Sequence, residues 1–145
     1  MTRDALRIGR VSETGRIYLI TTVTHDRRPW FLDFATARQV IQVMRQLSDE
    51  GVVVSLAWVL MPDHLHWLIQ LGDRLSLSVA VGRFKGRCAR RIGSGWAVWQ
   101  KGFHDHALRR DEDLAATARY IIANPLRAGL VRRVGDYPHW DAVWL

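Results

Sequence analysis

A β-hairpin in the middle of the chain is the feature that most restricts the fold. The segment from Val52 to Leu60 is almost continuously apolar and rich in β-branched residues, which predicts a strand in the centre of a sheet. Met61-Pro62-Asp63 is a turn signal, and His64 to Leu71 is predicted to return antiparallel to the first strand. The other elements are therefore expected to assemble around this hairpin.

Two further strands and three helices are predicted around the hairpin. Residues 16–24 form the first strand, and residues 99–108 form the fourth, with a bulge at Gly102. Apolar residues at helical spacing and capping residues predict helices over residues 33–51, 75–92 and 111–124, the last of them stopped by Pro125.

The order of these elements is typical of an α+β fold of the ferredoxin-like, split βαβ type. We expect a four-stranded antiparallel sheet with helices packed on it, plus an additional C-terminal helix that carries Tyr120. The 145 residues suit a single domain, with a core of about residues 15–131 and an irregular C-terminal tail over residues 132–145.

The charge of the chain points to a polyanionic partner. The formal net charge is +7, and all but two of the 21 basic residues are arginines, whose planar fork matches phosphate oxygens. Codon bias in a GC-rich genome is the alternative explanation. The candidate nucleic-acid contacts are Arg83, Lys85, Arg87, Arg90, Arg91, Arg109 and Arg110.

Cysteine content and hydropathy exclude several classes of protein. Cys88 is the only cysteine, so neither an intramolecular disulfide nor a cysteine-rich zinc site can form. No apolar stretch approaches the length of a membrane span, and no signal-peptide core is visible. We expect a cytoplasmic, nucleoid-associated protein with no membrane partner.

His64 and His66 are the first candidate site residues. Side chains alternate along a strand, so these two imidazoles share one face of the third strand, while Leu65 points to the other. Two such histidines can donate nitrogens to one divalent metal ion, although half-buried histidines with ordinary hydrogen bonds are the alternative.

Tyr120 and Asn124 lie one helical turn apart and therefore on one helix face. The Asn124 amide oxygen can bind Mg²⁺ or Mn²⁺, and the Tyr120 phenol can attack phosphorus. The alternatives are an edge aromatic and a helix-terminal residue. His104, His106 and Asp105 on the fourth strand are accessory candidates, for which a structural hydrogen-bonding role is the alternative.

Three segments together resemble a known family. Residues 61–69 (MPDHLHWLI) are similar to the histidine-hydrophobe-histidine segment of single-tyrosine HUH transposases. Residues 99–109 (WQKGFHDHALR) and 120–131 (YIIANPLRAGLV) resemble later blocks of the REP-associated tyrosine transposases, relatives of the smallest bacterial insertion-sequence transposases. The blocks occur in the family's order, and the resemblance covers roughly residues 15–131.

The resemblance implies a metal-dependent single-stranded DNA endonuclease and strand transferase. Carried over by position, His64 and His66 would hold Mg²⁺ or Mn²⁺, and Tyr120 would form a 5′-phosphotyrosine. Asn124 would be the third ligand, where insertion-sequence relatives usually have glutamine. The implied substrate is single-stranded DNA beside a hairpin of palindromic repeats, bound by a monomer or a homodimer. The sequence itself marks no general base for the phenol proton; metal-bound water, His104 and His106 are the candidates.

Other functions remain open at this point. An RRM-type sheet can bind single-stranded nucleic acid without cutting it, but the third strand carries two histidines in place of the glycine and aromatic pattern of that class. A domesticated transposase would only bind DNA. A hydrolase acting on another phosphoester is a more distant alternative.

Overall fold

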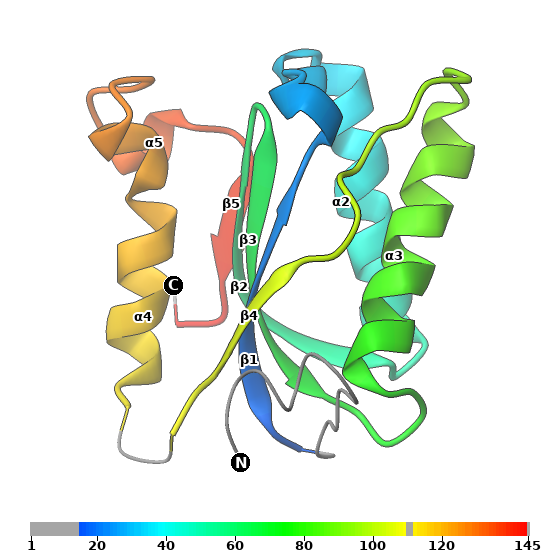
Figure 1. Cartoon of the computed structure of the whole chain (residues 1–145). Helices are drawn as coiled ribbons and strands as arrows, with labels where there is room; N and C mark the ends of the chain where they lie inside the picture. The colour runs from blue at the N-terminus through cyan, green and yellow to red at the C-terminus, as the bar shows by residue number, and fades with distance from the viewer. Residues whose placement is uncertain (1–14, 110–111, 145) are drawn as a thin grey trace.

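A five-stranded antiparallel sheet in the order β4-β1-β3-β2-β5 forms the centre of the molecule (Figure 1). The structure, a computed structural model, describes residues 15–109 and 112–144. The strands are β1 (Ile17–Val23), β2 (Val53–Met61), β3 (His64–Leu71), β4 (His104–Ala107) and β5 (Trp140–Ala142). The ferredoxin-like order of β1 to β4 is as predicted, and the prediction of four strands is corrected to five.

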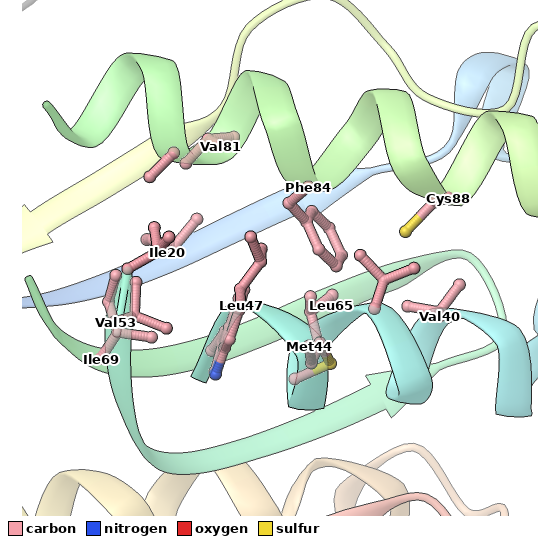
Figure 2. Close-up of a cluster of buried hydrophobic side chains, with 14 of the residues drawn as sticks. Ile20, Val40, Met44, Leu47, Val53, Leu65, Ile69, Val81, Phe84 and Cys88 are labelled. Carbon is pink, nitrogen blue, oxygen red and sulfur yellow. The ribbon is translucent and has the colours of Figure 1, made fainter. Parts of the chain in front are cut away.

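Two long helices cover one face of the sheet. These are α2 (Phe34–Asp49) and α3 (Leu77–Ile92), which lie side by side in Figure 1. Asp33 caps α2 by accepting the Thr36 N–H, and Gly93, at φ +62°, ends α3 in the left-handed region. The main core lies between these helices and the sheet (Figure 2), and it includes Ile20, Val40, Leu47, Leu65, Ile69 and Phe84.

A third helix, α4 (Leu114–Ile122), covers the opposite face. Asp113 caps it by accepting the Ala116 N–H at 3.0 Å. A second core lies beneath this helix, and it includes Ala57, Val59, Leu68, Ala118, Ile121 and Ile122. The sheet is therefore covered on both faces.

The helix that carries Tyr120 ends at Ile122, ahead of Pro125 as predicted, but a further helical turn that was not predicted follows it. A short helix α5 (Asn124–Arg127) follows α4 directly, with Pro125 in its first turn. Proline has no N–H to give to the Ile121 carbonyl four residues earlier. The Asn124 side-chain nitrogen donates to that carbonyl instead, at 2.7 Å, while the Arg127 N–H donates to the Ala123 carbonyl at 3.0 Å within the following turn.

Two other segments differ from the sequence prediction. Residues 99–108 run along β1, but only His104–Ala107 form a strand, because Gly102 adopts φ +75° and interrupts the pairing. The tail that was expected to be irregular contains a 3₁₀ turn, η3 (Val134–Asp136), and then β5, which pairs with β2. Two more 3₁₀ turns, η1 (His25–Arg27) and η2 (Trp30–Leu32), follow β1.

Over residues 15–109 and 112–144, no helix is long and apolar enough to cross a membrane.

Candidate active site

His64 and His66 lie together on the sheet face that α4 covers. Both belong to β3, and their partners on β2 are Met61 and Val59, two residues of the core beneath α4. The two imidazole centroids are 4.9 Å apart, and the rings are nearly perpendicular. The predicted shared face of these histidines is confirmed.

Each imidazole uses its Nδ1 atom within the protein. His64 Nδ1 lies 2.7 Å from the Asp63 Oδ1, and His66 Nδ1 lies 3.0 Å from the Thr21 Oγ1. A hydrogen bond at one ring nitrogen fixes the ring and directs the other nitrogen towards a ligand. The Nε2 atoms are thus the ones suited to bind a metal ion.

His66 is held in its neutral form. Burial is the main cause that lowers its pKa, and the neighbouring His64 and Arg127 lower it further, to about 4. A histidine must be neutral to bind a metal ion, because the protonated ring has no free lone pair. At neutral pH His66 is therefore ready to act as a ligand.

Tyr120 faces solvent from the end of α4, with 67% of its surface exposed. The Arg127 guanidinium lies 4.1 Å from the centre of the Tyr120 ring and donates to the Tyr120 carbonyl at 2.7 Å. The same guanidinium is close enough to His66 to lower its pKa. Arg127 therefore connects the tyrosine and the histidine pair.

Asn124 begins α5, between Tyr120 and Arg127. Its amide nitrogen donates to the Ile121 carbonyl, which leaves the carboxamide oxygen as the atom that suits a hard cation. The structural role considered from sequence is thus present, and it engages only one end of the amide.

His64 and His66 alone are too few ligands to hold a divalent metal ion. Among residues 15–109 and 112–144, no cluster of three or more His, Cys, Asp or Glu side chains is placed to hold a metal ion. A third protein ligand beside the two histidines would therefore be a group of another kind, and an amide oxygen such as that of Asn124 is one that Mg²⁺ or Mn²⁺ accepts. A phosphate oxygen of a substrate can occupy a further position.

The three accessory candidates on β4 have different surroundings. His104 pairs with Thr21, so it faces the same side of the sheet as His66. The His106 Nε2 lies 3.1 Å from the Glu112 carboxylate, which also accepts the Arg109 N–H, so this ring secures the approach to α4. Asp105 is buried on the α3 face, so it does not line the site.

The basic residues of α3 lie across the sheet from the histidines. Arg87 forms a two-point ion pair with Glu50, at 2.6 and 2.8 Å. Lys85 donates to the carbonyls of Gln100 and Gly102, and Arg91 donates to Gln39 and Gln42. The nucleic-acid face predicted for this helix is thus separated from the site, and Arg110 lies outside the described residues.

Three contributors to the site were not predicted from sequence: Thr21, Asp63 and Arg127. Asp63 had a signal, because a carboxylate directly beside a candidate ligand is suited to fix its ring. Arg127 lies two helical turns after Tyr120, but Pro125 between them hides that relation. Thr21 had no signal, because it is 45 residues from His66.

Known proteins resemble the chain over most of its length. The sequence profile of the family described as "Transposase IS200 like" matches residues 13–124. A Haemophilus influenzae protein assigned to the REP-associated tyrosine transposases is 26% identical over 140 residues, which cover 86% of this chain and 78% of that protein. The REP-associated tyrosine transposase of Escherichia coli K12 is 33% identical over 84 residues, or 57% of this chain and 50% of that protein.

Solved structures share the fold. A REP-associated tyrosine transposase bound to a REP hairpin superposes with a TM-score of 0.78 at 24% identity, covering 90% of this chain and 79% of that one. A Deinococcus radiodurans structure described as a transposase gives a TM-score of 0.56 at 21% identity, covering 79% and 94%.

Proposed function

Because this chain belongs to the IS200-like transposase family, a class of DNA-processing proteins, we propose that it is a metal-dependent endonuclease and strand transferase acting on single-stranded DNA beside a hairpin. Tyr120 is the proposed nucleophile, and His64, His66 and Asn124 are the proposed ligands of Mg²⁺ or Mn²⁺. The hairpin substrate is inferred from the solved relative, which is bound to a REP hairpin.

One observation carries the proposal. Two histidines, each with its ring fixed through Nδ1 and one of them, His66, held neutral, lie on the sheet face beneath α4, and the exposed Tyr120 of that helix is stacked against Arg127, whose charge acts on His66. A purely structural histidine pair has no need of a solvent-exposed phenol braced by a guanidinium. A metal-assisted tyrosine nucleophile needs side chains that can bind the metal ion and a phenol that the substrate can reach.

The reaction is a transesterification at phosphorus. The Tyr120 phenol oxygen bonds to phosphorus, the bond from phosphorus to the 3′-oxygen breaks, and the phenol proton is balanced by the proton that the released 3′-hydroxyl gains. His64, His66 and Asn124 would hold a divalent metal ion whose positive charge would polarise the scissile phosphate and offset the charge that develops in the transition state. The product is a 5′-phosphotyrosine and a free 3′-hydroxyl.

The covalent link makes rejoining independent of ATP. One phosphodiester is exchanged for another, so a 3′-hydroxyl can attack the phosphotyrosine and restore a DNA strand. Tyr120 permits one covalent link per chain at a time, so two simultaneous cleavages require a homodimer, whereas a monomer must act in sequence.

A binding-only role is the main alternative. An RRM-type domain presents an open sheet face to nucleic acid, whereas here α4 packs on the face that carries His64 and His66. This packing argues against the RRM-type module but not against a domesticated transposase that binds DNA through the same surface without cutting it.

A covalent-adduct assay separates cleavage from binding. End-labelled hairpin oligonucleotides with single-stranded flanks, incubated with protein and Mn²⁺, are expected to give a protein-linked product on a denaturing gel. Tyr120→Phe and addition of EDTA are each expected to abolish it. Tyr18→Phe is the matched control, because Tyr18 is a buried core tyrosine on β1.

Each result decides one part of the proposal. An adduct that persists in Tyr120→Phe would exclude Tyr120 as the nucleophile. A reaction that is unaffected by chelation would exclude the metal site. Tight binding of every hairpin without any adduct would favour the domesticated transposase.

A further inference from the structure

A groove of about 460 Å³ opens beside the turn that follows β1. It is bordered by η1, Arg28, Pro29 and Trp96. The turn is tied to the β2–β3 hairpin, because the backbone N–H and the hydroxyl of Thr24 both donate to the Asp63 carbonyl, at 2.9 and 3.1 Å. The groove therefore lies at the end of the sheet that carries His64.

The groove presents a tryptophan to solvent. Trp96 is 69% exposed, so its indole is not part of the core. The Arg28 guanidinium lies 5.3 Å from the ring centres of both Trp96 and Trp30, and it braces the exposed indole against the molecule. A braced indole offers the flat surface on which an unpaired base stacks.

Arg28 can hold a phosphate while it contacts the rings. The faces of a guanidinium stack on aromatic rings, whereas its N–H donors lie in the plane and point past them. Arg27 adds a second positive charge to the groove, and Asp26 contributes a negative one, 3.4 Å from the His25 Nε2. The groove thus combines a stacking surface with a net excess of cationic groups.

The turn after β1 has a strained backbone, and this backbone places Arg27 next to the carboxylate that contacts His64. Asp26 and Arg27 both adopt left-handed conformations, at φ 55° and 54°, which side chains other than glycine seldom take. The Arg27 Nε then lies 3.1 Å from the Asp63 Oδ2, while the other oxygen of that carboxylate contacts His64. One carboxylate therefore connects the groove wall and a proposed metal ligand.

We propose that this groove binds one unpaired nucleotide of the DNA strand that leads to the histidine site. The base stacks on Trp96, and its phosphate contacts Arg28. An unpaired base exposes both of its faces for stacking, whereas a base within a duplex does not. The inference rests on the proposed function, because it takes single-stranded DNA beside a hairpin as the ligand.

The test compares two ligands in the absence of cleavage. Fluorescence anisotropy with Tyr120→Phe protein in EDTA measures the Kd of a blunt hairpin and of hairpins with a short 5′ or 3′ single-stranded extension. One of the extended hairpins is expected to bind more tightly than the blunt one. Trp96→Ala and Arg28→Ala are each expected to weaken binding of that hairpin by at least about fivefold and to leave the blunt hairpin unchanged.

Matched variants make the test specific. Trp144→Ala and Arg133→Ala remove an exposed tryptophan and an exposed arginine outside the groove, and they are expected to leave both affinities unchanged. Trp96→Phe retains an aromatic face and is expected to keep part of the preference for the extension. Thermal unfolding of each variant verifies that the fold is intact.

The outcomes separate this inference from the proposed function. The inference is overturned if the extension adds no affinity, or if Trp96→Ala weakens both hairpins equally. If the extension effect depends on Trp96 but wild-type protein forms no adduct, the groove stands and the nuclease proposal falls. If no DNA binds at all, both are wrong.

Discussion

Arg127 is the residue whose role is clearest from geometry and least visible in the sequence. Its guanidinium stacks on the Tyr120 ring, donates to the Tyr120 carbonyl and lowers the pKa of His66. We therefore regard it as a positioning residue for the proposed nucleophile.

Arg127→Ala is expected to slow adduct formation by about 10- to 100-fold at saturating DNA, because a poorly oriented nucleophile seldom reaches the phosphate. Arg127→Lys keeps the charge but not the planar stack, so it restores the rate only in part. Titration of His66 by NMR is expected to give a higher pKa in Arg127→Ala. Arg119→Ala, on the exposed part of α4, is the control, and an equal effect of both variants would contradict the assignment.

His66 makes stability depend on pH. Its pKa falls from 6.5 in the unfolded chain to about 4 in the folded one, so the unfolded state binds more protons between these values. Above pH 6.5 His66 therefore imposes no penalty on the free energy of unfolding, and that free energy falls as the pH is lowered from 6.5 towards 4. Urea unfolding in EDTA is expected to show that His66→Gln removes about 2 kcal/mol of the loss between pH 7 and pH 5. Equal pH dependence in both proteins would contradict this result.

Strand alternation was sufficient to predict that His64 and His66 share a face, because that relation is local. Their hydrogen bonds were not predictable in the same way. The Thr21 contact depends on the register between β1 and β3, and the Arg127 contact depends on the path through Pro125. Sequence reasoning thus identified the proposed ligands and nucleophile but not the residues that hold them.

Among the helices and strands, α3 differs most from the role that was predicted for it. Its basic residues were predicted to contact nucleic acid, yet the helix packs on the face away from the histidines. Lys85 is half-buried, and burial lowers its pKa. Its ammonium group donates to the carbonyls of Gln100 and Gly102, in the segment that leads to β4. Lys85 therefore secures that segment to α3.

Lys85→Ala is expected to lower the free energy of unfolding by about 1–3 kcal/mol, because two carbonyls lose a charged donor. Chemical denaturation at neutral pH measures the change. Arg83→Ala, one half-turn away on the exposed side, is expected to stay within about 0.5 kcal/mol of wild type. A null effect of Lys85→Ala would show that water replaces the ammonium group without cost.

Helices and strands that follow from the local pattern of apolar residues were predicted well. Those that form only by pairing with another segment of the chain were not. β2, β3 and α2 follow directly from apolar periodicity. β5 has three residues with Asp141 at its centre, so no pattern marks it, and only the free edge of β2 makes it a strand.

In the molecule as a whole, the main hydrophobic core and the candidate site lie on opposite faces of the sheet. The α2–α3 face encloses the main core, whereas the α4 face carries the histidine pair, with Tyr120 at the end of α4. The turn after β1, the β2–β3 turn and α5 lie at one end of the sheet in Figure 1. The resemblance to IS200-like transposases, first seen in three short segments, is confirmed over residues 13–124.

This separation predicts which arginines meet DNA, despite a net charge of +7 spread over the chain. Each phosphate contact releases counterions, so the slope of log Kd against log salt reports how many contacts form. With Tyr120→Phe protein in EDTA and an extended hairpin, Arg28→Ala is expected to reduce that slope by about 1. Arg83→Ala and Arg90→Ala, on the far helix, are expected to leave it unchanged. If only the α3 variants reduced the slope, the DNA would lie on the α2–α3 face of the sheet. That result would contradict the prediction that DNA binds on the side of the histidine site.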